Sequence, residues 1–163
     1  MNVLVASDTH GRADRLREAL ERTAPAALLF LGDGLIDLAR VDMGTIPVRA
    51  VRGNCDTFGG EYPTMRLEVL GGVRILMMHG HLFDVTRAIY AAIEADADVL
   101  LYGHTHEPFS RVIAPSELDE SGSRQRPLAV LCPGSLGDPR SGAPTFGTLE
   151  IRENGVLPAI GVL

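Results

Sequence analysis

Short apolar runs that each end in a polar turn dominate the first half of the chain. Each run has the length and composition of a strand buried on both faces, and each turn carries Gly beside Asp, Asn or His. Helical periodicity over about residues 12–23, with Leu16, Ala19 and Leu20 on one face, follows the first turn. Strand, polar turn and helix in alternation predict a parallel α/β structure. The three runs cover residues 2–6, 27–31 and 48–51.

The middle of the chain predicts a hairpin and then a helix. Two extended runs, 64–70 and 73–78, are joined across Gly71-Gly72, a dipeptide that suits a tight hairpin turn. A helix is predicted over about residues 84–95 with Asp84 as its N-cap, and a buried strand follows over 99–102.

The last third of the chain predicts antiparallel strands. A short helix is also expected earlier, near residues 35–41, and the polar segment 115–126 predicts an exposed, mobile loop. No repeat or linker is visible, so we expect a single domain over residues 1–163. The antiparallel strands are expected near 109–113, 128–132, 145–151 and 156–162.

Composition restricts the partners and the compartment. The net charge of −6 and the absence of a basic tail argue against stable nucleic-acid binding. No apolar run approaches the roughly 18 residues of a membrane span, and the first run is too short for a signal peptide. We therefore expect a cytoplasmic protein with no membrane association, in which Cys55 and Cys132 are both reduced.

Polar side chains able to bind metals follow five of the predicted strands. Ligands of open α/β sheets bind outside the carboxyl ends of the strands, so these side chains are expected to converge. All five histidines of the chain, His81 included, lie in these turns. In an extended chain residues i and i+2 point to the same side, so each closely spaced pair is expected to aim at one point. The set is Asp8, His10, Asp33, Asn54, His79, His104 and His106.

Each motif taken alone has an ordinary explanation. An Asp-x-His after a strand is more often a turn with a solvated histidine, and a Gly-Asp is a common helix cap. The joint occurrence, using every histidine, favours a metal site. Two carboxylates, one amide and four imidazoles are too many ligands for one tetrahedral zinc ion, and they suit two metal ions that share a carboxylate.

The order of these motifs resembles the calcineurin-like metallophosphoesterases, and within them the small single-domain bacterial and archaeal phosphodiesterases. The resemblance runs from residue 1 to about residue 142, because Pro133-Gly134-Ser135 followed by Asp138-Pro139-Arg140 also resembles a segment of that branch. It implies a two-sheet β-sandwich flanked by helices, an α/β fold with two metal ions at the carboxyl ends of the strands.

The resemblance also implies which residues hold which ion. The bridging ligand would be Asp33, and manganese is the first choice of metal, with iron, nickel or zinc as alternatives. The first ion would be held by Asp8, His10, Asp33 and His106, and the second by Asp33, Asn54, His79 and His104.

The implied activity is metal-dependent hydrolysis of a small-molecule phosphodiester. A hydroxide that bridges the two ions would attack the phosphorus in line, so no protein base is required. Asp33, Asn54 and His79 are predicted to be catalytic through the metals. His81 is predicted to contact the phosphate or to support a ligand, and a purely structural role is equally open.

Three positions depart from the family pattern. Many members have a histidine that protonates the leaving group at the position of Cys55, and a thiol is a weaker acid catalyst near neutral pH. We therefore expect slow turnover of alkoxide-leaving substrates and faster turnover of activated aryl diesters. Cys132 replaces a frequent asparagine and Met78 a usual glycine, while Asp56 is expected to brace its turn.

Two other functions stay open. One is a binding scaffold without catalysis, like the similar retromer subunit, although that protein has lost ligands and this chain keeps all seven. The other is a phosphomonoesterase or pyrophosphatase acting at the same site. The apolar tail Val156–Leu163 is expected either in the core or at the interface of a homo-oligomer.

Overall fold

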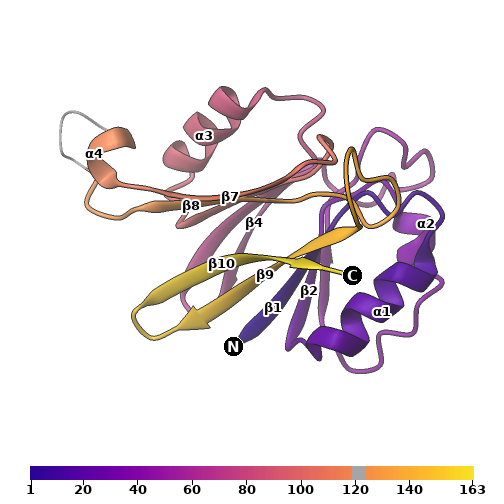
Figure 1. The fold of residues 1–163 in the computed structure, drawn as a ribbon. Coiled ribbons are helices and arrows are strands. Elements are labelled where there is room, and N and C mark those ends of the chain that lie inside the picture. The colour runs from indigo at the N-terminus through magenta and orange to yellow at the C-terminus, as the bar shows by residue number, and fades with distance from the viewer. Residues whose placement is uncertain (119–123) are drawn as a thin grey trace.

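Two five-stranded sheets pack face to face in the computed structural model, which describes residues 1–118 and 124–163 (Figure 1). The first sheet has the order β10-β9-β1-β2-β3. Its strands are β1 (Asn2–Ala6), β2 (Ala27–Phe30), β3 (Val48–Ala50), β9 (Thr145–Arg152) and β10 (Gly155–Val162).

The second sheet has the order β4-β5-β6-β8-β7. Its two long antiparallel pairs lie at its edges, and β5, β6 and β8 run parallel in its centre. Its strands are β4 (Met65–Leu70), β5 (Val73–Met78), β6 (Val99–Tyr102), β7 (Pro108–Ile113) and β8 (Leu128–Pro133).

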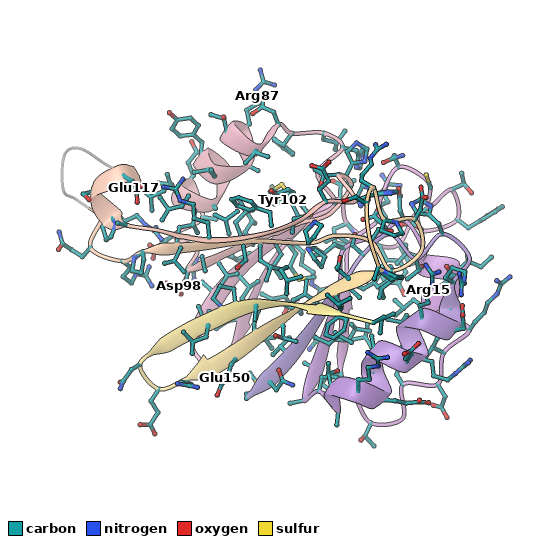
Figure 2. All side chains as sticks on the ribbon, in the orientation of Figure 1. Arg15, Arg87, Asp98, Tyr102, Glu117 and Glu150 are labelled. Carbon is teal, nitrogen blue, oxygen red and sulfur yellow. The ribbon has the colours of Figure 1, made fainter. Side chains whose placement is uncertain are left out.

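Helices cover the outer faces of the sandwich, as the family resemblance implies. The helix α1 (Ala13–Thr23) buries Leu16, Ala19 and Leu20 against the first sheet, with α2 (Leu35–Leu38) beside it. The helix α3 (Val85–Glu94) covers the second sheet, and Figure 2 shows Tyr102 between that sheet and α3. None of the described helices is long and apolar enough to cross a membrane. The predicted α/β fold, a two-sheet β-sandwich flanked by helices, is confirmed.

Local signals placed most elements correctly. Asp84 caps α3 by accepting a hydrogen bond from the backbone N–H of Arg87 at 2.9 Å. Gly71 and Gly72 have φ values of 54° and 82°, which permit the tight turn that pairs Leu70 with Val73. The tail 156–162 is a strand whose residues alternate, and Val156 and Ile160 pack against the core between the sheets.

Two predictions for the last third of the chain were wrong in part. β8 pairs parallel with β6, because the chain first turns back through β7 at the sheet edge. The segment predicted as a loop begins with a short helix, α4 (Pro115–Leu118). Proline suits the first helical position, and the Glu117 side chain accepts from the Ala114 N–H at 3.1 Å. Residues 119–123 of that predicted loop lie outside the described residues.

Candidate metal centre

All seven predicted ligands meet at one end of the sandwich. Parallel strands of both sheets, β1, β2 and β3 in one and β5 and β6 in the other, end there, so the turns after them face one another. A cavity of about 620 Å³ at the amino ends of β5 and β8, the opposite end, carries none of these side chains.

One group of ligand atoms comes from the turns after β1 and β6. The Nε2 atom of His106 lies 3.1 Å from Oδ1 of Asp8, and Nε2 of His10 lies 3.7 Å from the same oxygen. The two Nε2 atoms are 3.3 Å apart. Three donor atoms that converge to within 3.7 Å of one another form an arrangement that suits a cation.

A second group joins the turns after β2, β3, β5 and β6. Asp33, His79 and His104 each offer a donor atom, and these atoms all lie within 4.8 Å of one another. The Nε2 atom of His79 is 3.2 Å from Oδ2 of Asp33 and 3.2 Å from Oδ1 of Asn54. Asp33 also has a donor atom within 4.8 Å of one on His10, so its carboxylate connects the two groups.

The backbone of these turns corrects one step of the sequence argument. We expected Asp8 with His10, and His104 with His106, to point together because extended residues i and i+2 do so. These residues are left-handed instead, with φ values of 54°, 42°, 67° and 57°, and the second pair divides between the two groups. Asp33 has a φ of 54° as well. Strained backbone of this kind clusters at functional sites.

The Asp56 carboxylate holds the turn that carries Asp33. Its Oδ1 accepts from the N–H groups of Gly34 and Leu35 at 2.9 Å each, and its Oδ2 accepts from Asp33 at 2.7 Å and Gly53 at 2.8 Å. With both oxygens used by backbone donors, Asp56 braces the turn, as we expected.

The segment after β8 supports the turn that carries Asp8. The Ser135 hydroxyl donates to the Asp8 carbonyl at 2.7 Å, and the Gly137 N–H donates to the same carbonyl at 2.8 Å. The Ser135 hydroxyl also accepts from the Asp138 N–H at 2.7 Å. This contact connects the Pro-Gly-Ser motif to the site through the backbone.

Asp37 is a supporting residue that the sequence analysis missed. Its side chain is fully buried, and its Oδ2 accepts from the Thr9 hydroxyl and from the Gly11 N–H, both at 2.7 Å. The only signal was a carboxylate between apolar residues directly after the Gly-Asp-Gly turn, and we had assigned that segment to an ordinary short helix.

Backbone carbonyls orient two of the imidazoles. Nδ1 of His79 lies 2.9 Å from the Leu31 carbonyl oxygen, and Nδ1 of His106 lies 2.5 Å from that of Asp138. A carbonyl can only accept, so each Nδ1 carries the proton and each Nε2 has a free lone pair. Histidine ligands of metals are held in this way.

The charges of the site also fit a bound cation. Oδ1 of Asp8 is buried and has no hydrogen-bond donor in the part of the chain that the structure describes, and a buried carboxylate oxygen of this kind is costly unless a cation meets it. The Asp8 carboxylate, whose Oδ1 lies 3.7 Å from Nε2 of His10, raises the pKa of that histidine. For His79, burial lowers the pKa, but Asp33 and Asp8 outweigh burial and raise it. The residues present therefore fit divalent metal ions.

Cys55 and His81 stand beside the ligands. Burial, with Asp33 next, raises the pKa of the Cys55 thiol to about 11, so the thiol stays neutral. The ring of His81 lies 5.5 Å from that of His79, and its buried Nδ1 has no hydrogen-bond partner within residues 1–118 and 124–163. Burial and the neighbouring histidines lower the pKa of His81. Both cysteines are free thiols, as expected.

Comparison with known proteins identifies the family. The family model for the calcineurin-like phosphoesterase superfamily domain matches residues 1–154. A probable metallophosphoesterase of Methanothermobacter thermautotrophicus is 35% identical over 162 residues, which cover 93% of this chain and 86% of that protein. The phosphodiesterase YfcE of Escherichia coli is 29% identical over 191 residues, covering 99% of this chain and 92% of YfcE.

A solved structure shows the same likeness in three dimensions. The crystal structure of a predicted phosphoesterase from Streptococcus pneumoniae superposes with a TM-score of 0.73 at 26% identity, covering 99% of this chain and 88% of that one. The match of the family model includes every strand whose carboxyl end carries one of the seven side chains. The chain belongs to the calcineurin-like phosphoesterase superfamily.

Proposed function

We propose that this chain is a metal-dependent phosphodiesterase whose seven converging side chains hold two divalent ions. The observation that carries the proposal is the position of Asp33, whose carboxylate belongs to the group with His79 and His104 and also lies within 4.8 Å of His10 in the other group. Family membership supplies the reaction class, hydrolysis of phosphoric esters. The likeness to YfcE, itself named a phosphodiesterase, favours a diester as the substrate.

The ligand assignment is part of the proposal. The two donor groups have different memberships, and Asp33 of the second group also has a donor atom within 4.8 Å of one on His10 in the first. Nitrogen and oxygen donors together suit manganese, which we propose as the working metal, with iron, nickel and zinc as alternatives. One ion would be held by Asp8, His10, Asp33 and His106, and the other by Asp33, Asn54, His79 and His104.

Two bound divalent ions would polarise the phosphoryl oxygens and supply a hydrolytic water of lowered pKa. The residues of the chain then have to fix geometry. The carbonyls of Leu31 and Asp138 hold the rings of His79 and His106, and Asp56 holds the turn of Asp33. Because these supports are rigid backbone contacts, the ligand atoms are positioned before any ion or substrate arrives.

Two cationic or polar side chains are available for the phosphate. Arg52 lies close enough to His81 for its charge to lower the pKa of that histidine, and Arg52 forms no ion pair with any other described residue. We propose that Arg52 and His81 bind the non-bridging phosphate oxygens. Cys55, kept neutral by its raised pKa, would be a slow acid for the leaving group, so activated aryl diesters should turn over faster than alkyl diesters.

The decisive experiment compares Asp33→Ala with a matched carboxylate variant. Asp42→Ala is suitable because Asp42 is exposed and lies outside both donor groups. With Mn²⁺ added, the native chain and Asp42→Ala should hydrolyse bis(p-nitrophenyl) phosphate, and Asp33→Ala should lose activity and bound manganese together. Activity that survives Asp33→Ala, or a metal-loaded native chain without activity, would refute the proposal.

Parallel measurements separate the neighbouring functions. Rates on p-nitrophenyl phosphate and pyrophosphate, set against the diester rate, distinguish a phosphomonoesterase or pyrophosphatase from a diesterase.

Arg52→Ala should raise KM more than it lowers kcat, because Arg52 would bind phosphate in the ground state as well as in the transition state. A cytoplasmic location, in keeping with two free cysteines, also belongs to the proposal.

A further inference from the structure

The edge strand β4 leaves an apolar stripe uncovered. It pairs with β5 on one side and with no described strand on the other. Met65, Leu67 and Val69 are 43%, 40% and 56% exposed on one face, and Arg66 and Glu68 are half-buried on the opposite face. The apolar cluster beneath α3 includes residues of β5, β6 and β8 but, among the described residues, none of β4.

The pattern of β4 is complementary to itself. If a second copy of β4 pairs antiparallel so that the two Leu67 residues face each other, Met65 lies opposite Val69 of the second copy. In the same register Arg66 lies opposite Glu68 of the second copy. By symmetry, Glu68 lies opposite Arg66 of the second copy. Apolar residues then meet on one face and opposite charges on the other, and the contact closes by two-fold symmetry.

The charges make this edge selective. Charged side chains that point inward from an edge strand usually prevent pairing with other strands. Here Arg66 contacts Glu68 on its own strand, and Glu68 also lies 3.4 Å from the Arg49 guanidinium of β3. These contacts hold both charges on the inner face. A strand without the reciprocal charges would place no opposite charge across from Arg66 and Glu68, whereas a second copy in this register places one across from each.

We propose that the chain forms a homodimer through antiparallel pairing of β4 with β4 of a second copy, on a two-fold axis at Leu67. The β4-β5-β6-β8-β7 sheets of the two copies would join into one continuous sheet. The stripe of Met65, Leu67 and Val69 would then be covered. This inference goes beyond the proposed activity and does not depend on it, because none of the seven ligands lies on β4.

Charge reversal gives the sharpest test. Sedimentation equilibrium of the native chain should give twice the chain mass of 17.5 kDa, with a monomer appearing on dilution. Arg66→Glu alone, and Glu68→Arg alone, place like charges opposite each other twice, and each should weaken dimerisation on the order of 10-fold or more. The double variant Arg66→Glu/Glu68→Arg should dimerise again. The two single variants, when mixed, should form a heterodimer because each charge on β4 of one copy then faces an opposite charge on β4 of the other.

Cross-linking keeps the proposal testable if a charge variant fails to fold. Directly opposite positions have Cβ atoms about 5 Å apart, so Leu67→Cys in a Cys55→Ser background should form an intermolecular disulfide under mild oxidation. Val69→Cys in the same background is the control, because the introduced thiols would lie several residues apart. A native chain that is monomeric at every concentration, single variants that dimerise like the native chain, or Val69→Cys cross-linking as readily as Leu67→Cys would each overturn the proposal.

Discussion

The Asp56 carboxylate offers the clearest test of how the site is built. Alanine at this position leaves four backbone N–H groups, those of Asp33, Gly34, Leu35 and Gly53, without their acceptor. A hydrogen bond to a charged group contributes about 1.5–3 kcal/mol, but the four share one carboxylate and water can reach some donors. We therefore expect Asp56→Ala to lower the free energy of unfolding by about 3–5 kcal/mol.

Urea unfolding followed by circular dichroism measures this loss, and a melting temperature about 10–15 °C lower should accompany it. Asp42→Ala is the matched control, since Asp42 is exposed and accepts one backbone hydrogen bond from the described residues, that of the Gly44 N–H at 2.9 Å. We expect that variant to lose less than about 1 kcal/mol. The loss of unfolding free energy in Asp56→Asn should lie between the losses in Asp56→Ala and Asp42→Ala. Its side-chain oxygen still accepts from one pair of backbone N–H groups, but its NH2 group faces the other pair and cannot accept from them.

Metal affinity supplies the functional part of the same test. Asp33 is placed by its own N–H bond to Asp56, so Asp56→Ala should weaken Mn²⁺ binding by about 10–100-fold, as loss of a supporting contact commonly does. Asp42→Ala should bind Mn²⁺ like the native chain. The reasoning is refuted if the free energies of unfolding of Asp56→Ala and Asp42→Ala differ by less than about 1 kcal/mol.

Three further predictions follow from close contacts and from shifted pKa values. A Cβ on Gly53 would lie 2.0 Å from Oδ1 of Asp33, so Gly53→Ala should reduce bound manganese measured by mass spectrometry, while Gly60→Ala, which enters open space, should not. Burial raises the pKa of Cys132 to about 11 from 9.0, so the unfolded thiol ionises first as pH rises. Stability should therefore fall by about 2 kcal/mol between those values in urea titrations, and Cys132→Ala should flatten the decline. The pKa of His79 is raised, so protons should compete with Mn²⁺ for Nε2 as pH falls. The Mn²⁺ affinity measured by calorimetry should therefore decrease at lower pH, and equal affinity at pH 6 and 8 would contradict this.

The strand ends were predictable because their signals are local. An apolar run limited by glycine and a polar ligand identifies both a strand and its carboxyl end, and Asp8, Asp33 and His79 were located in this way. The order of strands was harder to predict, because pairing depends on which edge the chain reaches next. β8 returns to the centre beside β6 only after β7 has formed the edge, and no residue of β8 indicates that.

The supporting contacts were not predictable for a different reason. Asp37 and Ser135 act across long sequence separations, on the Thr9 hydroxyl and the Asp8 carbonyl, and a single sequence has no signal for such pairs. Asp56 was predictable because the carboxylate lies within the same turn as one of its donors, Gly53. The sequence therefore placed the proposed ligands at the strand ends and predicted the local brace, while the distant braces appeared only in the fold.

Backbone strain favours catalysis over a scaffold role. Five of the proposed ligands adopt positive φ angles, at a cost of about 1 kcal/mol or more each: Asp8, His10, Asp33, His104 and His106. A scaffold that needed only the shape of these turns would be more stable with glycine there, since glycine adopts such angles without strain. Aspartate and histidine in strained turns, supported by the carboxylates of Asp37 and Asp56, are reasonable only if the direction of their side chains matters. That direction brings the carboxylates and imidazoles of both groups to adjoining points, which is the geometry that dinuclear hydrolysis of a phosphoric ester requires.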